Sequence, residues 1–109
     1  MIEEVILNYL KENLDVFVGF EEPSDVQEYV LIEKTGGSIN DYVESATIAL
    51  KSYSDTLYNA AKLNEEVKTT MNNIVVLNEI SSAKLNTDYN FTDTTKKKYR
   101  YQAVYDLVY

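Results

Sequence analysis

Histidine and cysteine are both missing from this chain of 109 residues. Without cysteine there is no disulfide, no thiolate nucleophile and no sulfur ligand for a metal, which fits a reducing compartment such as the cytoplasm. Without histidine the chain also lacks the usual general base and metal ligand near neutral pH. Most nucleophilic and zinc-dependent chemistry is therefore excluded. We expect no enzymatic activity, no cofactor and no bound metal.

Glycine and proline are scarce, with three glycines and one proline. Together with a hydrophobic content of 45%, this indicates an ordered chain that suits one domain over residues 1–109. No apolar run approaches the roughly 18 to 20 residues that cross a bilayer. The N-terminal segment carries acids where a signal peptide would carry lysines. We therefore expect a soluble protein that is not secreted by that route.

Basic residues are outnumbered by acidic ones, ten against eighteen, which gives a net charge of −8 and a pI near 4.4. Such a surface repels DNA and anionic membranes, so neither is an expected binding partner. The one basic cluster, Lys96 to Arg100, could contact phosphate. In an acidic protein, however, such lysines more often begin a solvated edge strand, and we prefer that interpretation.

Apolar residues recur with helical spacing in two segments. The first, Ile2–Asn13, has acids in its first turn, where the helix dipole favours them. The second should run from about Ser54 to about Asn73, with Ser54 or Asp55 as its N-cap. Its inner face is expected to comprise Leu57, Ala60, Ala61, Asn64, Val67, Met71 and Ile74.

Alternating apolar and polar residues predict five strands. They are Leu14–Phe20, the run EYVLIEKTGG, the run around Ala46–Leu50, Leu85–Thr92 and the segment from Tyr99 onward. A loop at Thr35–Asn40 should join the second and third strands, with its two glycines there for positive φ. The order α-β-β-β-α-β-β predicts an α+β fold, with two helices against a mainly antiparallel or mixed sheet of about four or five strands.

Two short segments resemble ligand sites but lack required residues. Asp88–Asp93 has the alternating oxygens of a calcium loop, but neither the glycine at its turn nor the glutamate at its end. The run TGG at Thr35–Gly37 is not followed by the lysine and helix of a phosphate-binding loop. We therefore predict neither ligand at these segments.

Tyrosine, by contrast, is abundant, with ten residues in the chain. Tyr99, Tyr101, Tyr105 and Tyr109 share one face of the last predicted strand. Tyrosine is common in protein interfaces because it combines a large contact area with a polar tip. A small core rarely takes four phenols, since each buried hydroxyl needs a partner. Two interpretations remain open: part of this face contacts another subunit, or the whole face is core.

Several segments, taken in order, resemble the tail terminator proteins of bacteriophages with long non-contractile tails and Gram-positive hosts. These proteins are also called tail completion or minor capsid proteins. The segments are YVLIEKTGG, ATIALKSYSDTLYNAA, and DYNFTDT followed by KYRYQAVYDLVY, and together they cover nearly the whole chain. None is a catalytic signature, so the resemblance rests on their order.

This resemblance implies a structural virion protein that forms a homohexameric ring and has no catalytic residues. The ring would cap the tail tube, end its elongation and provide the surface for head–tail joining. Its partners would be further copies of itself, the major tail tube protein and a head-completion or connector protein. DNA would pass through without being specifically bound, and no membrane would be involved. The protein would assemble in the host cytoplasm and end at the head–tail interface of the virion.

The expected contact residues lie in the predicted hairpin loop, before the final turn and at the start of the last strand. They are Lys34, Thr35, Gly36, Gly37, Asp88, Tyr89, Asn90, Phe91, Tyr99 and Tyr101. Three other interpretations stay open: a different ring of the neck, such as a head-closure or adaptor protein, a small protein-interaction module, or an enzyme that uses carboxylates and tyrosine. A deep pocket with convergent acids would favour the enzyme.

Overall fold

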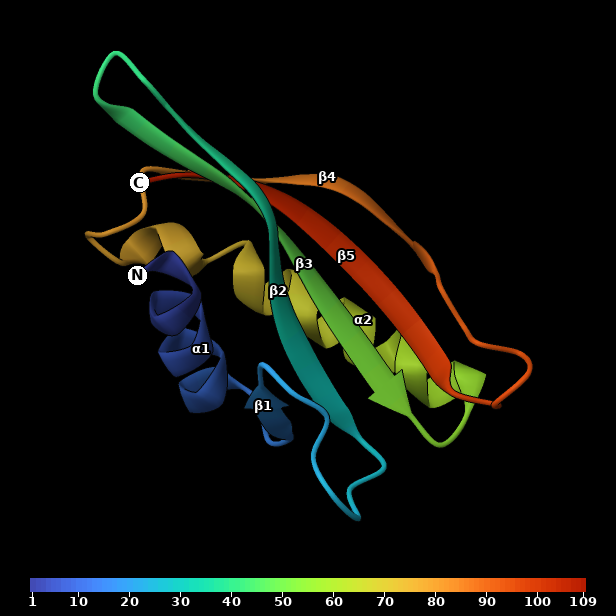
Figure 1. Ribbon diagram of the computed structural model, residues 1–109. Coiled ribbons are helices and arrows are strands. Elements are labelled where there is room, and N and C mark those ends of the chain that lie inside the picture. Colours follow the sequence, from blue (N-terminus) through green and yellow to red (C-terminus); the bar gives the residue numbers. More distant parts are fainter.

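A computed structural model describes all 109 residues (Figure 1). In chain order the elements are helix α1 (Ile2–Asn13), strands β1 (Phe17–Gly19), β2 (Tyr29–Asn40) and β3 (Val43–Ser54), helix α2 (Leu57–Met71), the short 3-10 helix η1 (Ile74–Val76), and strands β4 (Ser82–Asn90) and β5 (Tyr99–Val108). Two helices and a five-stranded mixed sheet in this order confirm the predicted α+β fold.

The strands form one sheet in the order β1-β2-β3-β5-β4. Only β1 and β2 run parallel, and all other neighbours are antiparallel. Since β1 pairs only with Tyr29–Leu31, most of β2 presents a free edge, as does β4 at the other side of the sheet. Both helices cover the same face of the sheet (Figure 1), so the opposite face has no second layer.

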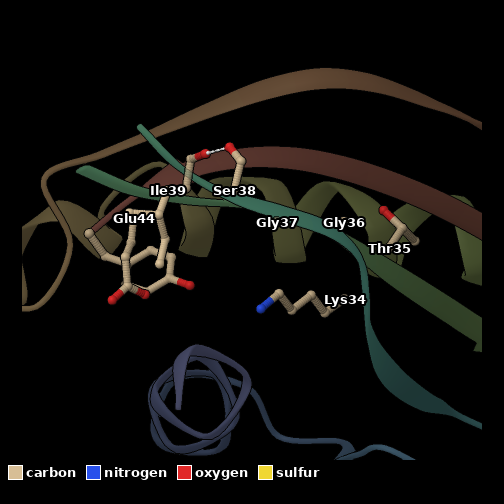
Figure 2. A pocket seen from close by; sticks show the side chains of 9 residues that line it. Lys34, Thr35, Gly36, Gly37, Ser38, Ile39 and Glu44 are labelled. Carbon is tan, nitrogen blue, oxygen red and sulfur yellow. Dashed lines mark hydrogen bonds between the residues drawn. The ribbon is translucent and has the colours of Figure 1, made fainter. Parts of the chain in front are cut away.

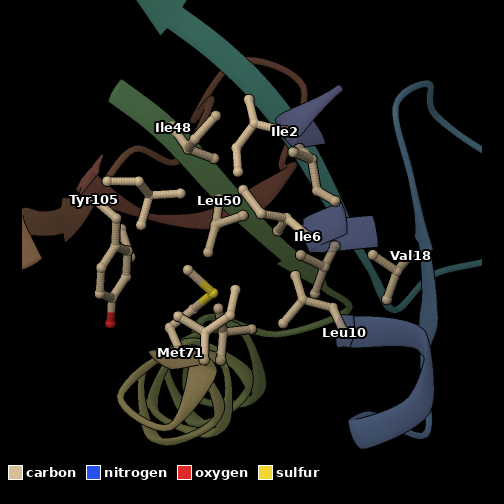
Figure 3. Packing of buried hydrophobic residues seen from close by; sticks show 14 of the residues in the cluster. Ile2, Ile6, Leu10, Val18, Ile48, Leu50, Met71 and Tyr105 are labelled. Carbon is tan, nitrogen blue, oxygen red and sulfur yellow. The ribbon is translucent and has the colours of Figure 1, made fainter. Parts of the chain in front are cut away.

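The hydrophobic core lies between the two helices and the covered face of the sheet (Figure 3). Helix α1 contributes Ile2, Ile6 and Leu10, which are spaced by four residues and therefore lie on one side of the helix. Alternate residues of the strands face the helices, as their period of two requires. The buried strand residues of the core are Val18, Val30, Ile32, Ala46, Ile48, Leu50, Ala103, Tyr105 and Leu107.

Helix α2 begins later than predicted, at Leu57–Met71. Its N-cap is Thr56, whose extended backbone (φ −135°, ψ 157°) lets Oγ1 accept a hydrogen bond of 3.1 Å from the amide of Asn59. The prediction of Ser54 or Asp55 as the N-cap is wrong. Ser54 still pairs within β3, and Asp55 Oδ1 accepts instead from the side chain of Asn59.

Strands β2 and β3 form a long hairpin whose turn is not where the glycines predicted it. The strand continues through the expected loop at Thr35–Asn40, so that prediction is wrong. The turn consists of Asp41 and Tyr42, with φ values of 50° and 68°. Positive φ at both central residues defines the two-residue turn that matches the twist of a hairpin. No glycine of the chain has a positive φ.

The two glycines differ in their surroundings, since an added Cβ would meet no atom within 4 Å at Gly36 but would make close contacts at Gly37. Gly36 follows an irregularity in pairing between Lys34 and Gly36, where β2 carries an extra residue opposite β3. At Gly37 an added Cβ would come within 2.9 Å of Lys34 Cε and 3.3 Å of the Ser45 carbonyl oxygen. The missing side chain thus lets Lys34 lie across the strand.

The basic cluster Lys96–Arg100 leads into β5, which is an interior strand between β3 and β4. The prediction that the cluster begins an edge strand is therefore wrong, because β4 occupies the edge. Lys97 has a φ of 53°, and Asp93 pairs with Lys98 across the turn. The lysines belong to the loop between β4 and β5.

Two other predicted strands have different bounds. The expected strand Leu14–Phe20 is reduced to Phe17–Gly19, and the expected strand Leu85–Thr92 runs from Ser82 to Asn90. In both cases partners decide the bounds: β1 extends only as far as it pairs with β2, and β4 follows β5.

Candidate interaction surfaces

The subunit is elongated, with extents of 44 × 26 × 22 Å. The turn of the β2-β3 hairpin lies at one end, and the loops that follow β1 and β4 lie at the other (Figure 1). Each end exposes apolar and charged residues together. These two ends are the candidate functional surfaces.

The projecting part of the hairpin, residues 38–45, is referred to here as the arm. At its tip Ile39 is 67% exposed, Val43 49% and Tyr42 fully exposed. A bulky residue with positive φ costs on the order of 1 kcal/mol, and such strain is typical of functional positions. Tyr42 gains no intramolecular burial in return. Tyr42 is therefore a candidate contact residue that the prediction from sequence missed.

A hollow of about 440 Å³ lies beneath the arm on the side of the helices (Figure 2). All four predicted contact residues of β2, Lys34, Thr35, Gly36 and Gly37, line it together with residues of the arm and Tyr109. Figure 2 shows the Lys34 side chain extended below the strand. Glu44 is the only carboxylate side chain in this lining, so no acids converge here. Nowhere in the chain do three acidic side chains gather in a way that could hold a metal ion.

At the opposite end, a row of aromatic rings crosses the uncovered face of the sheet. Tyr29 and Tyr53 stack with their centroids 4.6 Å apart. Arg100 Nη1 donates a hydrogen bond of 2.7 Å to the Tyr53 hydroxyl, and the guanidinium lies 4.2 Å from the Phe91 centroid. The Tyr89 ring follows at 5.6 Å from Phe91. These five residues form the aromatic row, and tyrosine and arginine are the residue types that most often dominate binding at interfaces.

The register between neighbouring strands brings the side chains of this row together. Tyr29 is the direct partner of Tyr53 in β3, and Tyr53 is the direct partner of Arg100 in β5. Directly opposite residues on antiparallel strands hold their side chains in contact. Two of the predicted contact residues, Tyr89 and Phe91, thus belong to the row.

The other two predicted contact residues of this segment have partners within the subunit. Asp88 faces the helices, where its carboxylate accepts hydrogen bonds from Asn64 Nδ2 at 3.4 Å and from Lys68 Nζ at 3.3 Å. Asn90 Oδ1 accepts from the amide of Thr92 at 3.0 Å. Asp88 therefore ties the edge strand to α2, and Asn90 shapes the turn that follows.

A second hollow of about 300 Å³ lies beside the aromatic row, at the ends of the strands. We call it the end groove. It is lined by residues 22, 26 and 27 of the loop after β1, by residues 97 and 98, by Tyr29, Tyr53 and Tyr99 at the strand ends, and by Ser54 and Asp55. The predicted contact residue Tyr99 thus lies beside two further tyrosines that sequence spacing did not bring together.

The face of β5 that carries four tyrosines is divided between core and surface. Tyr105 is 1% exposed and belongs to the core. Tyr99 and Tyr101 are half-buried, with Ser54 and Ser52 of β3 as their register partners. Tyr105 therefore fits the interpretation as core, whereas Tyr99 remains accessible from the end groove.

Glu22 holds the two loops of this end together. Its Oε1 accepts hydrogen bonds from the Tyr29 hydroxyl at 3.0 Å and from Lys98 Nζ at 2.6 Å. Burial, followed by the hydrogen bond to Glu22, raises the pKa of Tyr29. The hydrogen bonds from Lys98 and from Tyr29 lower the pKa of Glu22. The end groove is therefore shaped by a fixed contact between its walls.

The contact between Lys98 and Glu22 predicts a measurable shift in the pKa of the Glu22 carboxylate. In the wild-type protein, NMR titration should place the pKa of Glu22 below its ordinary value of 4.5. Because the folded value lies below the unfolded one, the contact stabilises the fold above about pH 4.5 and is lost as pH falls through the folded pKa. Lys98→Met should raise the pKa of Glu22, whereas Lys84→Met in β4 should not. An unchanged Glu22 pKa in Lys98→Met would rule out the lysine as the cause.

No protein-family model matches this chain, and no curated protein matches it at a significant level. None of its helices combines the length and apolarity needed to pass through a bilayer.

Proposed function

We infer that this protein is a tail terminator of a bacteriophage with a long non-contractile tail. It is a structural protein whose ring caps the tail tube, ends tube elongation and offers the surface for head joining. The observation that carries this proposal is the presence of two different surfaces, each with exposed apolar and charged residues, at opposite ends of one elongated subunit. A head-to-tail contact between unlike surfaces generates a ring when its rotation closes.

The segments that resemble the family favour a place at the neck of a phage tail. YVLIEKTGG supplies β2 from Tyr29 to Gly37, up to the start of the arm, and DYNFTDT with KYRYQAVYDLVY supplies part of β4, part of the loop after it and β5. The partners are further copies of the chain, the tail tube protein and a head-completion or connector protein. The protein assembles in the host cytoplasm and ends in the virion.

The negative charge of the chain suits a ring through which DNA passes. Six copies at −8 each would carry roughly −48, and a like-charged lumen would keep DNA from binding to the wall. The ring would thus guide DNA without recognising it.

The test is the length of tails made without this protein. A phage that lacks the gene should produce tubes that extend past normal length and carry no heads, because nothing ends their growth. Electron microscopy of lysates measures both, and the gene supplied in trans should restore both. Normal tail length with detached heads would instead indicate a head-closure or adaptor protein. Normal length with attached heads would contradict any role in the neck.

A further inference from the structure

The arm is apolar and acidic at its tip. Besides Ile39, Tyr42 and Val43 it carries Asp41 and Glu44, and the chain has no lysine or arginine between Lys34 and Lys51. None of the four salt bridges within the subunit involves either acid of the arm. The tip therefore presents an aromatic ring next to two unneutralised negative charges.

The end groove offers the complementary properties. Three tyrosine rings, Tyr29, Tyr53 and Tyr99, line a hollow of about 300 Å³, the low end of the size range of ligand pockets and a size that suits a protruding side chain. Lys97 and Lys98, from the only run of consecutive basic residues, belong to its lining together with the carboxylates of Glu22 and Asp55, and Lys96 precedes them in the chain. Of these three lysines, Lys98 is paired with Glu22, whereas Lys96 and Lys97 make no salt bridge. Lys97 in the lining and Lys96 next to it in the chain thus carry two positive charges that no salt bridge neutralises, against the one unpaired carboxylate of the lining, Asp55.

We propose that the arm of one subunit docks in the end groove of a second copy of the chain. Tyr42 enters the hollow, and Asp41 and Glu44 face Lys96 and Lys97 of the next copy. The arm cannot reach its own groove, because the two lie at opposite ends of a molecule 44 Å long (Figure 1). The contact is therefore head-to-tail, and it rests on the proposed function for its closure into a ring.

This contact also explains the strained turn. Tyr42 keeps a positive φ of 68° although glycine or asparagine would relieve the strain. A residue held in such a conformation without intramolecular contacts is explained if its side chain binds elsewhere. The aromatic ring at the tip is then the anchor of the interface, a role that tyrosine often has.

The absence of cysteine makes the contact testable by engineered disulfides. Val26 lines the end groove, so Val26→Cys combined with Tyr42→Cys should give a reducible ladder of covalent multimers after mild oxidation at high protein concentration. The matched control combines Val26→Cys with Val76→Cys, a residue of η1 that is 71% exposed but lies outside the arm. This control pair should form at most about one tenth of the covalent multimers that the Val26 and Tyr42 cysteines form. Equal ladders from both pairs would overturn the proposed contact.

A series of charge reversals tests the proposed ion pairs between the arm and the end groove. In the background of the Val26 and Tyr42 cysteines, Asp41→Lys with Glu44→Lys should reduce the ladder roughly tenfold or more, because like charges would then meet. Lys96→Glu with Lys97→Glu should do the same. All four reversals together should restore the ladder, since the signs are again complementary. If the variant with all four reversals does not regain the ladder of covalent multimers, the proposed pairing of these charges is overturned.

The outcome is separable from that of the proposed function. If the ladder forms as expected but tails made without the gene keep normal length, the contact stands and the terminator function fails. If tails overgrow without the gene but the ladder matches its control, the function stands and the ring is built from other surfaces.

Discussion

Replacement of Tyr105 with alanine is expected to lower the free energy of unfolding by about 3 to 5 kcal/mol. Tyr105 is 1% exposed in the middle of β5 and packs in the core against α2 (Figure 3). Truncation removes an aromatic ring from a close-packed site, which leaves a cavity that the surrounding strands cannot fill. A domain of this size has about 5 to 15 kcal/mol of stability in total. In chemical denaturation, the Tyr105→Ala variant should therefore unfold at a much lower midpoint concentration of denaturant than the wild type.

Tyr105→Phe is the matched control. The Tyr105 hydroxyl is buried without a hydrogen-bond partner within the protein, and burial raises its pKa. Loss of an unpartnered hydroxyl removes a desolvation cost while the ring remains in place. The phenylalanine variant should match the wild type or exceed its stability by about 1 kcal/mol. A loss as large as that of the alanine variant would show that the hydroxyl, and not the ring, stabilises this site.

Tyr99→Ala is expected to leave the fold nearly intact and to impair assembly. Tyr99 is only half-buried at the start of β5 and lines the end groove. Truncation of an interface aromatic commonly removes about 2 kcal/mol or more of binding free energy, which is roughly a 30-fold loss of affinity. In a complementation test the variant should give overlong or headless tails. Tyr58→Ala, at a position in α2 that is 76% exposed and outside the groove, should give normal tails.

The two tyrosine variants together separate fold from function. If Tyr99→Ala unfolds as readily as Tyr105→Ala and tail length stays normal, the whole face of β5 is core. The contact surface would then lie in the loops alone. If both variants fold and both give normal tails, neither interpretation of the tyrosine face survives.

The order of elements could be predicted because periodicity is a local property of the chain. Ile2, Ile6 and Leu10 follow the period of a helix, and Ala103, Tyr105 and Leu107 follow that of a strand. Each period identifies which face of the helix or strand is buried in the core. Leu63 of α2 is an exception, since it is buried although the predicted face did not include it.

The features of the candidate surfaces depended on information that local patterns do not contain. Glycine predicts the wrong position for the turn, because Asp41 and Tyr42 adopt the positive φ whereas Gly37 makes room for Lys34. The aromatic row depends on the register that sets Tyr53 beside Arg100. A shift of one residue would send these side chains to opposite faces, and no single sequence reveals which register pairs distant strands.

The place of β5 in the sheet also determines when the chain can fold. β5 lies between β3 and β4, although it follows both in the sequence. While the ribosome is still making the segment before Tyr99, the nascent chain has no partner for the inner edge of β3, and Ile48 and Leu50 cannot be fully enclosed. Pairing of distant strands also carries the entropy cost of closing a long loop. Folding is therefore completed only after Tyr99–Val108 has emerged, and until then the inner edge of β3 is open to pairing with other chains.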